Sequence, residues 1–314
     1  MLYFSLLFLE QIVSMLIMAA IGFALVRAKA VKRFQYDALS KVVLYVACPC
    51  SVLNSCFVEP TRERILGFGI AVIVTFLVHI LFILGTDALE RPLRLTAAEK
   101  TSLIYSNAGN FTLPIVTAVL GAEYSFYIAP FLCVQLIFIW SHGKKIMSRQ
   151  KGWEFRKILM NPCVIAVVAG LLCFLFSLRL PNVVLTVVRS ASNSLGFLSM
   201  LFIGMLLAEL RLKDIVGNPR VYLICAGRLL VYPLVVAILF AVVSALFHLP
   251  LLDRVLFVVL LPCAAPTAAM TAQMAQLYGC DAPHAGTITA TSVVLAVITM
   301  PFIIYIYQFL ISIL

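Results

Sequence analysis

Charged residues are scarce in this chain of 314 residues: 11% are charged, 63% are hydrophobic, and the mean hydropathy is +1.10. Soluble globular domains carry about 25% charged residues, so this composition excludes that class. Apolar runs long enough to cross the ~30 Å hydrocarbon core of a bilayer recur along the chain. They are continuous and do not alternate with polar residues, which favours helices over a transmembrane β-barrel. We therefore predict an all-α polytopic membrane protein whose first partner is the lipid bilayer.

Groups suited to acid–base catalysis or metal binding are also few. The four histidines are scattered, and the apolar runs contain neither an HExxH motif nor paired aspartates, which argues against an intramembrane enzyme. The nine cysteines include no CxxC motif and mostly lie in apolar runs, where cysteine commonly packs as a small hydrophobic residue. We expect no catalytic residue, no metal site and no cofactor, and we leave coupling to H⁺ or Na⁺ open.

Basic residues outnumber acidic ones by 23 to 13, which gives a formal net charge of +10. They lie almost wholly between the apolar runs, so they indicate membrane topology and not a nucleic-acid partner. Ten runs predict transmembrane helices at residues 3–26, 38–57, 65–86, 99–120, 124–141, 161–179, 185–208, 220–246, 254–277 and 283–312. Lysine and arginine are concentrated in the odd-numbered connections, so by the positive-inside rule these are cytoplasmic and both termini are extracytoplasmic. Those residues are Arg27, Lys29, Lys32 and Arg33, then Arg91, Arg94 and Lys100, then Lys144, Lys145, Arg149, Lys151, Arg156 and Lys157, and finally Arg211, Lys213 and Arg220.

The basic connection at 142–160 divides the ten spans equally. Residues 1–141 hold five spans and residues 161–314 hold five, with 142–160 as a cytoplasmic linker. Because five is odd, the second set must enter the membrane with the opposite orientation. This arrangement is the inverted-topology repeat that is common in secondary transporters.

Helix-breaking residues interrupt the fourth span of each set. The run Ser106–Pro114 contains two asparagines, a glycine and a proline, and the run Pro262–Thr267 contains two prolines. Free backbone groups find no water in hydrocarbon, so such breaks persist only where they line a cavity or are buried in protein. Proline and glycine are also frequent in membrane helices generally, which leaves structural kinks as the alternative. Breaks at matching positions favour a transporter's binding site, with helices four and nine crossing at the midplane.

The residues at the breaks favour an anionic ligand. The second half-helices are predicted to begin near Phe111–Pro114 and Pro266–Ala268, where free N–H groups and the helix dipole attract negative charge. Neither break contains Asp or Glu, which argues against a cation exchanger with a carboxylate site. The amides could instead serve only to satisfy the broken backbone. The candidate substrate-binding residues are Asn107, Gly109, Asn110, Thr112, Pro114, Pro262, Pro266, Thr267, Gln273 and Asn54.

Three further polar residues lie within apolar runs. Arg228 is expected to snorkel to the cytoplasmic end of its span or to pair within the structure, with a counter-charge for the substrate as a third possibility. Glu10 is a candidate coupling residue, as an intramembrane carboxylate is by default, unless it lies at the outer interface. His79 is expected to be a hydrogen-bonded core residue.

Three segments resemble the auxin efflux carrier family, within the bile acid/auxin-carrier-like superfamily. They are Leu39–Leu53, Ser106–Leu120 with its Asn-Ala-Gly-Asn-Phe-Thr-Leu-Pro-Ile core, and Leu260–Gly279 with its Pro-x-x-x-Pro break. The resemblance implies ten helices in two inverted five-helix repeats, and an elevator-like movement of a transport domain against a scaffold domain, each drawn from both repeats. It also implies organic-anion substrates: auxin in plants, and malonate, malate or related carboxylates in bacteria. The short 142–160 connection is typical of bacterial members, so we expect the inner membrane of a bacterial cell.

These observations predict a secondary active transporter of a small organic anion. A sodium-coupled carrier of larger bile-acid-like anions is the alternative within transport. A non-transporting sensor on the same fold is the alternative outside it. Formation of a homodimer is left open.

Overall fold

A computed structural model describes residues 2–148, 156, 159–178, 180–209 and 217–314, and within them the chain is helical and forms no strand. The helices are α1 (Leu2–Arg27), α2 (Arg33–Val42), η1 (Val43–Ala47), α3 (Cys48–Ser55), α4 (Arg62–Leu93), α5 (Ala97–Ile104), η2 (Ala108–Thr112), α6 (Leu113–Val119), α7 (Ala122–Ser125), α8 (Ile128–Phe138), η3 (Ile139–Gly143), α9 (Lys144–Ser148), α11 (Pro162–Leu175), α12 (Asn182–Glu209), α14 (Pro219–Ala226), η4 (Gly227–Val231), α15 (Tyr232–Phe247), α16 (Pro250–Cys263), α17 (Ala269–Leu277) and α18 (Ala282–Ile313). The η elements are π-helical turns within longer helices. The predicted all-α class is confirmed.

Six helices in the described part of the chain are long and apolar enough to cross a membrane. They are Ala38–Ser55, Arg62–Leu93, Glu123–Ser148, Asn182–Ala208, Pro219–Phe247 and Ala282–Ile313. Three shorter apolar helices, Val13–Arg27, Ala108–Val119 and Pro162–Leu175, overlap the predicted spans 3–26, 99–120 and 161–179. The structure thus supports a multi-pass membrane protein, while the count of ten spans stays a prediction.

Several helices extend beyond the predicted spans because charged residues are placed favourably at their ends. The span predicted at 65–86 is α4, which begins where Thr61 accepts the Arg64 N–H at 3.2 Å and ends with Arg91 in its last turn. An acid near a helix N-terminus and a base near its C-terminus suit the helix dipole, so hydropathy alone stops too early. The span predicted at 124–141 likewise continues as a helix through Lys144 to Ser148. The linker residues 149–155 and 157–158 lie outside the described residues.

Three of the four π-helical turns in the described residues end two residues before a proline: η1 before Pro49, η2 before Pro114 and η4 before Pro233. Proline lacks an N–H and its ring clashes with the carbonyl four residues earlier. In each case the residue before the proline donates its N–H to the carbonyl five residues back. This wider turn carries the helix past the proline without interruption.

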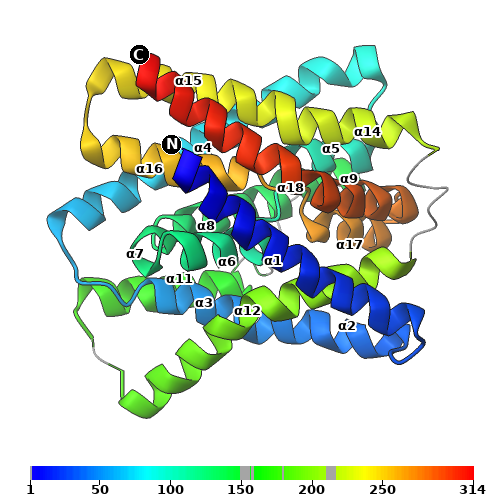
Figure 1. Cartoon of the computed structure of the whole chain (residues 1–314), viewed down its shortest axis with the longest axis horizontal. Helices are drawn as coiled ribbons and strands as arrows, with labels where there is room; N and C mark the ends of the chain where they lie inside the picture. Colours follow the sequence, from blue (N-terminus) through cyan, green and yellow to red (C-terminus); the bar gives the residue numbers. More distant parts are fainter. Residues whose placement is uncertain (1, 149–155, 157–158, 179, 210–216) are drawn as a thin grey trace.

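The helices form two packed groups (Figure 1). In one group α1, α2, α3, α11 and α12 pack against one another, and α2, α3, α11 and α12 lie along the lower part of the view. In the other, α4, α5, α8 and α14 to α18 pack together. The short helix α6 and the turn η2 that precedes it contact members of both groups. The two breaks in the predicted fourth and ninth spans lie on the second group's side of this boundary.

Reciprocal glycines hold α1 and α12 together as a close antiparallel pair. A Cβ added at Gly204 would lie 1.8 Å from the Ala19 carbonyl oxygen, and one added at Gly22 would lie 2.0 Å from the Leu201 carbonyl oxygen. Small residues let helix backbones approach each other, and close packing drives helix association in membranes. The contact depends on the absence of side chains at these two positions.

We expect Gly204→Ala to lower the thermal unfolding midpoint of the protein purified in detergent. The added methyl group must push α1 and α12 apart, and overpacking of this kind costs about 1–3 kcal/mol. Gly69→Ala is the matched control, because a Cβ on that helical glycine meets nothing within 4 Å. Equal midpoints for the two variants would show that the close approach does not contribute to stability.

Candidate functional site

The two breaks pair with each other through their backbones. The first break, residues 105–107, separates α5 from η2, and the second, residues 264–268, separates α16 from α17. The Asn107 N–H donates to the Pro266 carbonyl at 2.8 Å, and the Ala268 N–H donates to the Tyr105 carbonyl at 3.0 Å. Ser106 and Thr267 form an antiparallel bridge between these two bonds. Segments about 160 residues apart in sequence therefore satisfy each other's freed backbone groups, as interior breaks require.

Side chains from two other helices complete the backbone pairing. On α8, Gln135 accepts the Ser106 N–H at 2.9 Å and donates to the Ser106 carbonyl at 2.9 Å. On α18, the Ser292 hydroxyl accepts the Thr267 N–H at 3.1 Å. The Thr267 hydroxyl donates to the Ser102 carbonyl at 3.1 Å, in the last turn of α5.

Arg228, in η4, binds the C-terminal ends of both first half-helices. Its Nη1 donates to the Leu103 carbonyl of α5 at 3.4 Å. Its Nη2 donates to the Pro262 carbonyl of α16 at 3.1 Å, and its Nε donates to the Ala265 carbonyl at 3.2 Å. The side chain is 0% exposed, so the expected snorkelling is wrong and the expected pairing within the structure is confirmed. Gly227 makes this approach possible, since a Cβ there would lie 2.8 Å from a Leu103 methyl group.

The second half-helices begin beside this backbone contact. The first begins at Ala108 with Asn107 as its N-cap, and the second begins at Ala269 with Ala268 as its N-cap. The predicted start near Phe111–Pro114 is therefore wrong by about one turn, because η2 carries the helix past Pro114. Neither N-cap forms a side-chain cap. The first N–H groups of a helix have no intrahelical acceptor, so two positive helix ends are available in one place.

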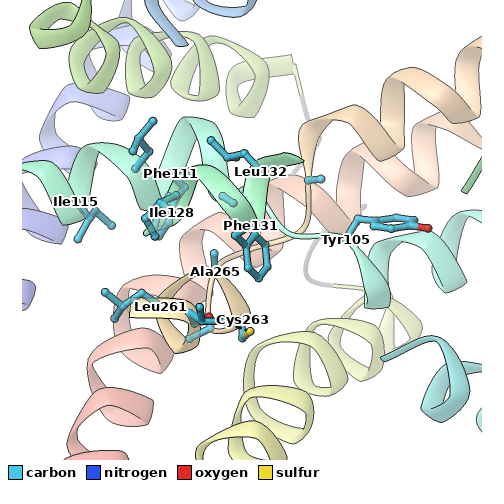
Figure 2. Packing of buried hydrophobic residues seen from close by; sticks show 14 of the residues in the cluster. Tyr105, Phe111, Ile115, Ile128, Phe131, Leu132, Leu261, Cys263 and Ala265 are labelled. Carbon is cyan, nitrogen blue, oxygen red and sulfur yellow. Dashed lines mark hydrogen bonds between the residues drawn. The ribbon is translucent and has the colours of Figure 1, made fainter. Parts of the chain in front are cut away.

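Buried apolar side chains surround the breaks (Figure 2). The labelled residues Phe111 and Ile115, Ile128 and Phe131, and Leu261 and Cys263 come from η2 and α6, α8, and α16 respectively. Such surroundings keep water out and strengthen the electrostatic influence of the helix ends.

Five buried polar atoms near the breaks have no hydrogen-bond partner among the described residues. They are Asn107 Nδ2, Thr112 Oγ1, Ser102 Oγ, Thr291 Oγ1 and Ser199 Oγ. Asn107 is the N-cap of η2 and Thr112 is its last residue, Ser102 lies in the last turn of α5, and Thr291 is next to Ser292. Ser199 lies one turn along α12 from Gly196, where a Cβ would touch Pro114 at 3.4 Å. Because buried polar groups normally have partners, these atoms are the available donors and acceptors for a ligand.

The structure brings most of the predicted site residues together. Asn107, Pro262, Pro266 and Thr267 are buried at the contact between the breaks, and Gly109, Asn110, Thr112 and Pro114 follow within the next two turns of η2 and α6. Asn110 is half-buried, and a Cβ at Gly109 would lie 3.3 Å from the Cys48 sulfur of α3.

Other candidates lie outside the buried contact. Gln273 is exposed on α17, and Glu10 is exposed on α1. Asn54 is half-buried on α3, six residues further along than Cys48. His79 is fully buried, with Nδ1 2.8 Å from the Thr75 carbonyl oxygen and its ring stacked on Phe138, which confirms it as a hydrogen-bonded core residue.

The sequence analysis did not identify Gln135 and Ser292 as site residues. Their side chains lie on other helices and form hydrogen bonds with the free backbone groups of the two breaks. Gln135 carried a usable signal, since it is the one polar residue in the apolar run Phe131–Trp140. Ser292 carried none, because serine is common in membrane helices and its hydroxyl can bond to its own helix. It does so here, to the Thr289 carbonyl at 2.7 Å, while also accepting from Thr267.

Comparison with known proteins agrees with this architecture. A family model described as a membrane transport protein matches residues 7–155 and residues 153–304, which together span nearly the whole chain. A search of curated proteins finds no match.

We expect Gln135→Met to lower the free energy of unfolding by about 1–3 kcal/mol. Methionine has a similar length but leaves the N–H and the carbonyl of Ser106 without their Gln135 partner, and the expected range corresponds to about 0.5–1.5 kcal/mol for each of these two groups if they recover part of their hydrogen bonding elsewhere. Thermal unfolding in detergent measures the effect. Gln273→Met is the matched control, because it makes the same chemical change at an exposed position. A variant as stable as the control would remove Gln135 from the support of the break.

Proposed function

The chain belongs to the auxin efflux carrier family of membrane transport proteins, which is a transporter family and not an enzyme family. From this premise we propose that it is a secondary active transporter of a small organic anion, namely a carboxylate. One observation carries the proposal: the pairing of the two breaks gathers two helix N-termini and a buried guanidinium around one point.

The charges at the site support an anion as the substrate. The N-terminal ends of η2 and α17 carry partial positive charge, and Arg228 adds a full one. Neither break contains a carboxylate to oppose them. Neutral donors and acceptors, such as Asn107 and Thr112, can orient the anion without charge. The surrounding apolar side chains favour a small substrate, because the ligand must fit among buried residues.

The membrane arrangement that we propose has ten spans in two inverted repeats. In support, the described helices form five runs before the 142–160 connection and five after it, and the fourth run of each set is the one that is broken. The basic connections support a topology in which both termini are extracytoplasmic. The short 142–160 connection supports the inner membrane of a bacterium as the location. The paired breaks then lie near the midplane, where transporters of this design bind their substrates.

The proposed mechanism is an elevator. The helix group that contains both breaks serves as the transport domain, and the group of α1, α2, α3, α11 and α12 serves as the scaffold. The site would move with its own complete set of backbone partners, since Gln135, Arg228 and Ser292 all belong to the moving group. The contacts between the two groups, which include those of α1 with α18, of α11 with α8 and of α12 with η2, would have to change during the movement.

Uptake into proteoliposomes tests the function. Labelled mono- and dicarboxylates are expected to enter vesicles that contain the protein with saturable kinetics, and to compete with one another but not with labelled sugars or amines.

In the same vesicles Asn110→Ala should raise KM about tenfold, the value of one hydrogen bond to a charged group. Asn182→Ala, an exposed asparagine at the start of α12, is the control. Absence of carboxylate transport across the whole panel would refute the proposal, and an unchanged KM would remove Asn110 from the site.

A reversible cross-link tests the elevator. A Cβ at Gly196 of α12 would lie 3.4 Å from the Pro114 Cβ of α6, close to the spacing that a disulfide needs. Oxidation of the double variant Pro114→Cys, Gly196→Cys should join α12 of the scaffold to α6, which directly continues η2 after the first break, and stop uptake, and a thiol reductant should restore it. The two single variants control for the native cysteines. Uptake that continues while the cross-link is complete would contradict relative movement at this contact.

A further inference from the structure

The carbonyl groups bound by Arg228 are those that other transporters offer to a cation. Where membrane helices are broken, unwound carbonyls and half-helix C-termini commonly coordinate a coupling Na⁺. Here the Leu103 carbonyl comes from the end of α5, and the Pro262 and Ala265 carbonyls come from the end of α16. All three accept from one guanidinium, so a protein cation already occupies the negative ends of both half-helices.

Arg228 is enclosed within the protein. The side chain is 0% exposed, and its guanidinium carbon lies 5.5 Å from the centre of the Phe82 ring, within the range of a cation–π contact. Gly227, next to Arg228, lies close to the Leu103 side chain of α5, where an added Cβ would be 2.8 Å from a methyl group. An ion at the same carbonyls would have to displace the guanidinium or lie beside a like charge in an apolar interior, where repulsion is strong.

The charge of Arg228 is also uncompensated by acids. No carboxylate among the described residues forms an ion pair with it, and its partners there are carbonyl dipoles and an aromatic ring. Arginine does not release its proton in proteins, so this charge neither dissociates nor titrates. The site therefore keeps a permanent positive charge that a substrate carboxylate can balance.

We propose that Arg228 takes the place of a coupling cation, so that the carrier binds and moves its anion without Na⁺. The inference rests on the proposed transport of an anion. It adds that Arg228 supplies the positive charge that balances the negative charge of that anion. It also predicts a latent property: without the guanidinium, the three carbonyls become a Na⁺ site.

The experiment compares NaCl with choline chloride at equal ionic strength, using two readouts. The first is the thermal unfolding midpoint in detergent, which requires no substrate. We expect the same midpoint for the wild type in both salts, and a midpoint about 2 °C higher in 100 mM NaCl for Arg228→Ala. Arg228→Lys is the matched control, because it keeps a cation at the site and should show no response to Na⁺. If Arg228→Ala does not fold, Arg228→Gln replaces it with the same expectation.

The second readout is uptake of the labelled carboxylate panel by the wild type, which should proceed at equal rates in the two salts. A wild-type midpoint or uptake rate that rises with Na⁺ would overturn the proposal, and so would a neutral variant that folds but shows no Na⁺ response. Failure of every carboxylate to enter the vesicles refutes the transport function separately, because the midpoint measurements do not depend on transport.

Discussion

The fold depends on an exchange of backbone hydrogen bonds between two interrupted helices. Each break frees N–H and carbonyl groups in an interior without water, and neither could exist alone at an acceptable cost. The bonds from Asn107 to Pro266 and from Ala268 to Tyr105 make each break the partner of the other. Gln135, Ser292 and Arg228 satisfy the groups that this exchange leaves over. The helices that carry these three side chains must therefore pack around the breaks.

The same constraint produces the chemistry of the site. A broken helix has a negative end and a positive end where it is interrupted, and the antiparallel contact brings two of each together. Arg228 binds the negative ends, whereas the positive ends at Ala108 and Ala269 are left without side-chain caps. Backbone satisfaction and the proposed preference for anions would thus be two results of one arrangement. The Asn107 amide and the Thr112 hydroxyl are buried there without a hydrogen-bond partner among the described residues.

Prediction from the sequence succeeded where a local pattern decides the structure. Hydropathy identified the helical class, and the residues at both breaks pointed to the site before their contact was known. It failed at two residues whose local character suggested a helix boundary, a proline and a charged lysine. Pro114 was expected to mark a helix start, yet the π-helical turn before it keeps the helix continuous. Lys144 was expected in a loop, yet it lies in a helix, since a basic residue suits a helix C-terminus.

The sequence by itself determined that this protein is helical, that it belongs in a membrane and that two of its helices are interrupted. Composition and residue order are enough for these properties, because the bilayer acts on each segment separately. Only the tertiary structure decided what the interruptions do. Arg228 shows the reason. An arginine near a helix end can extend its side chain to water or bind backbone carbonyls. It binds carbonyls only if another segment of the chain presents them. Here α5 and α16 both do, so a residue that looked peripheral lies at the centre of the site.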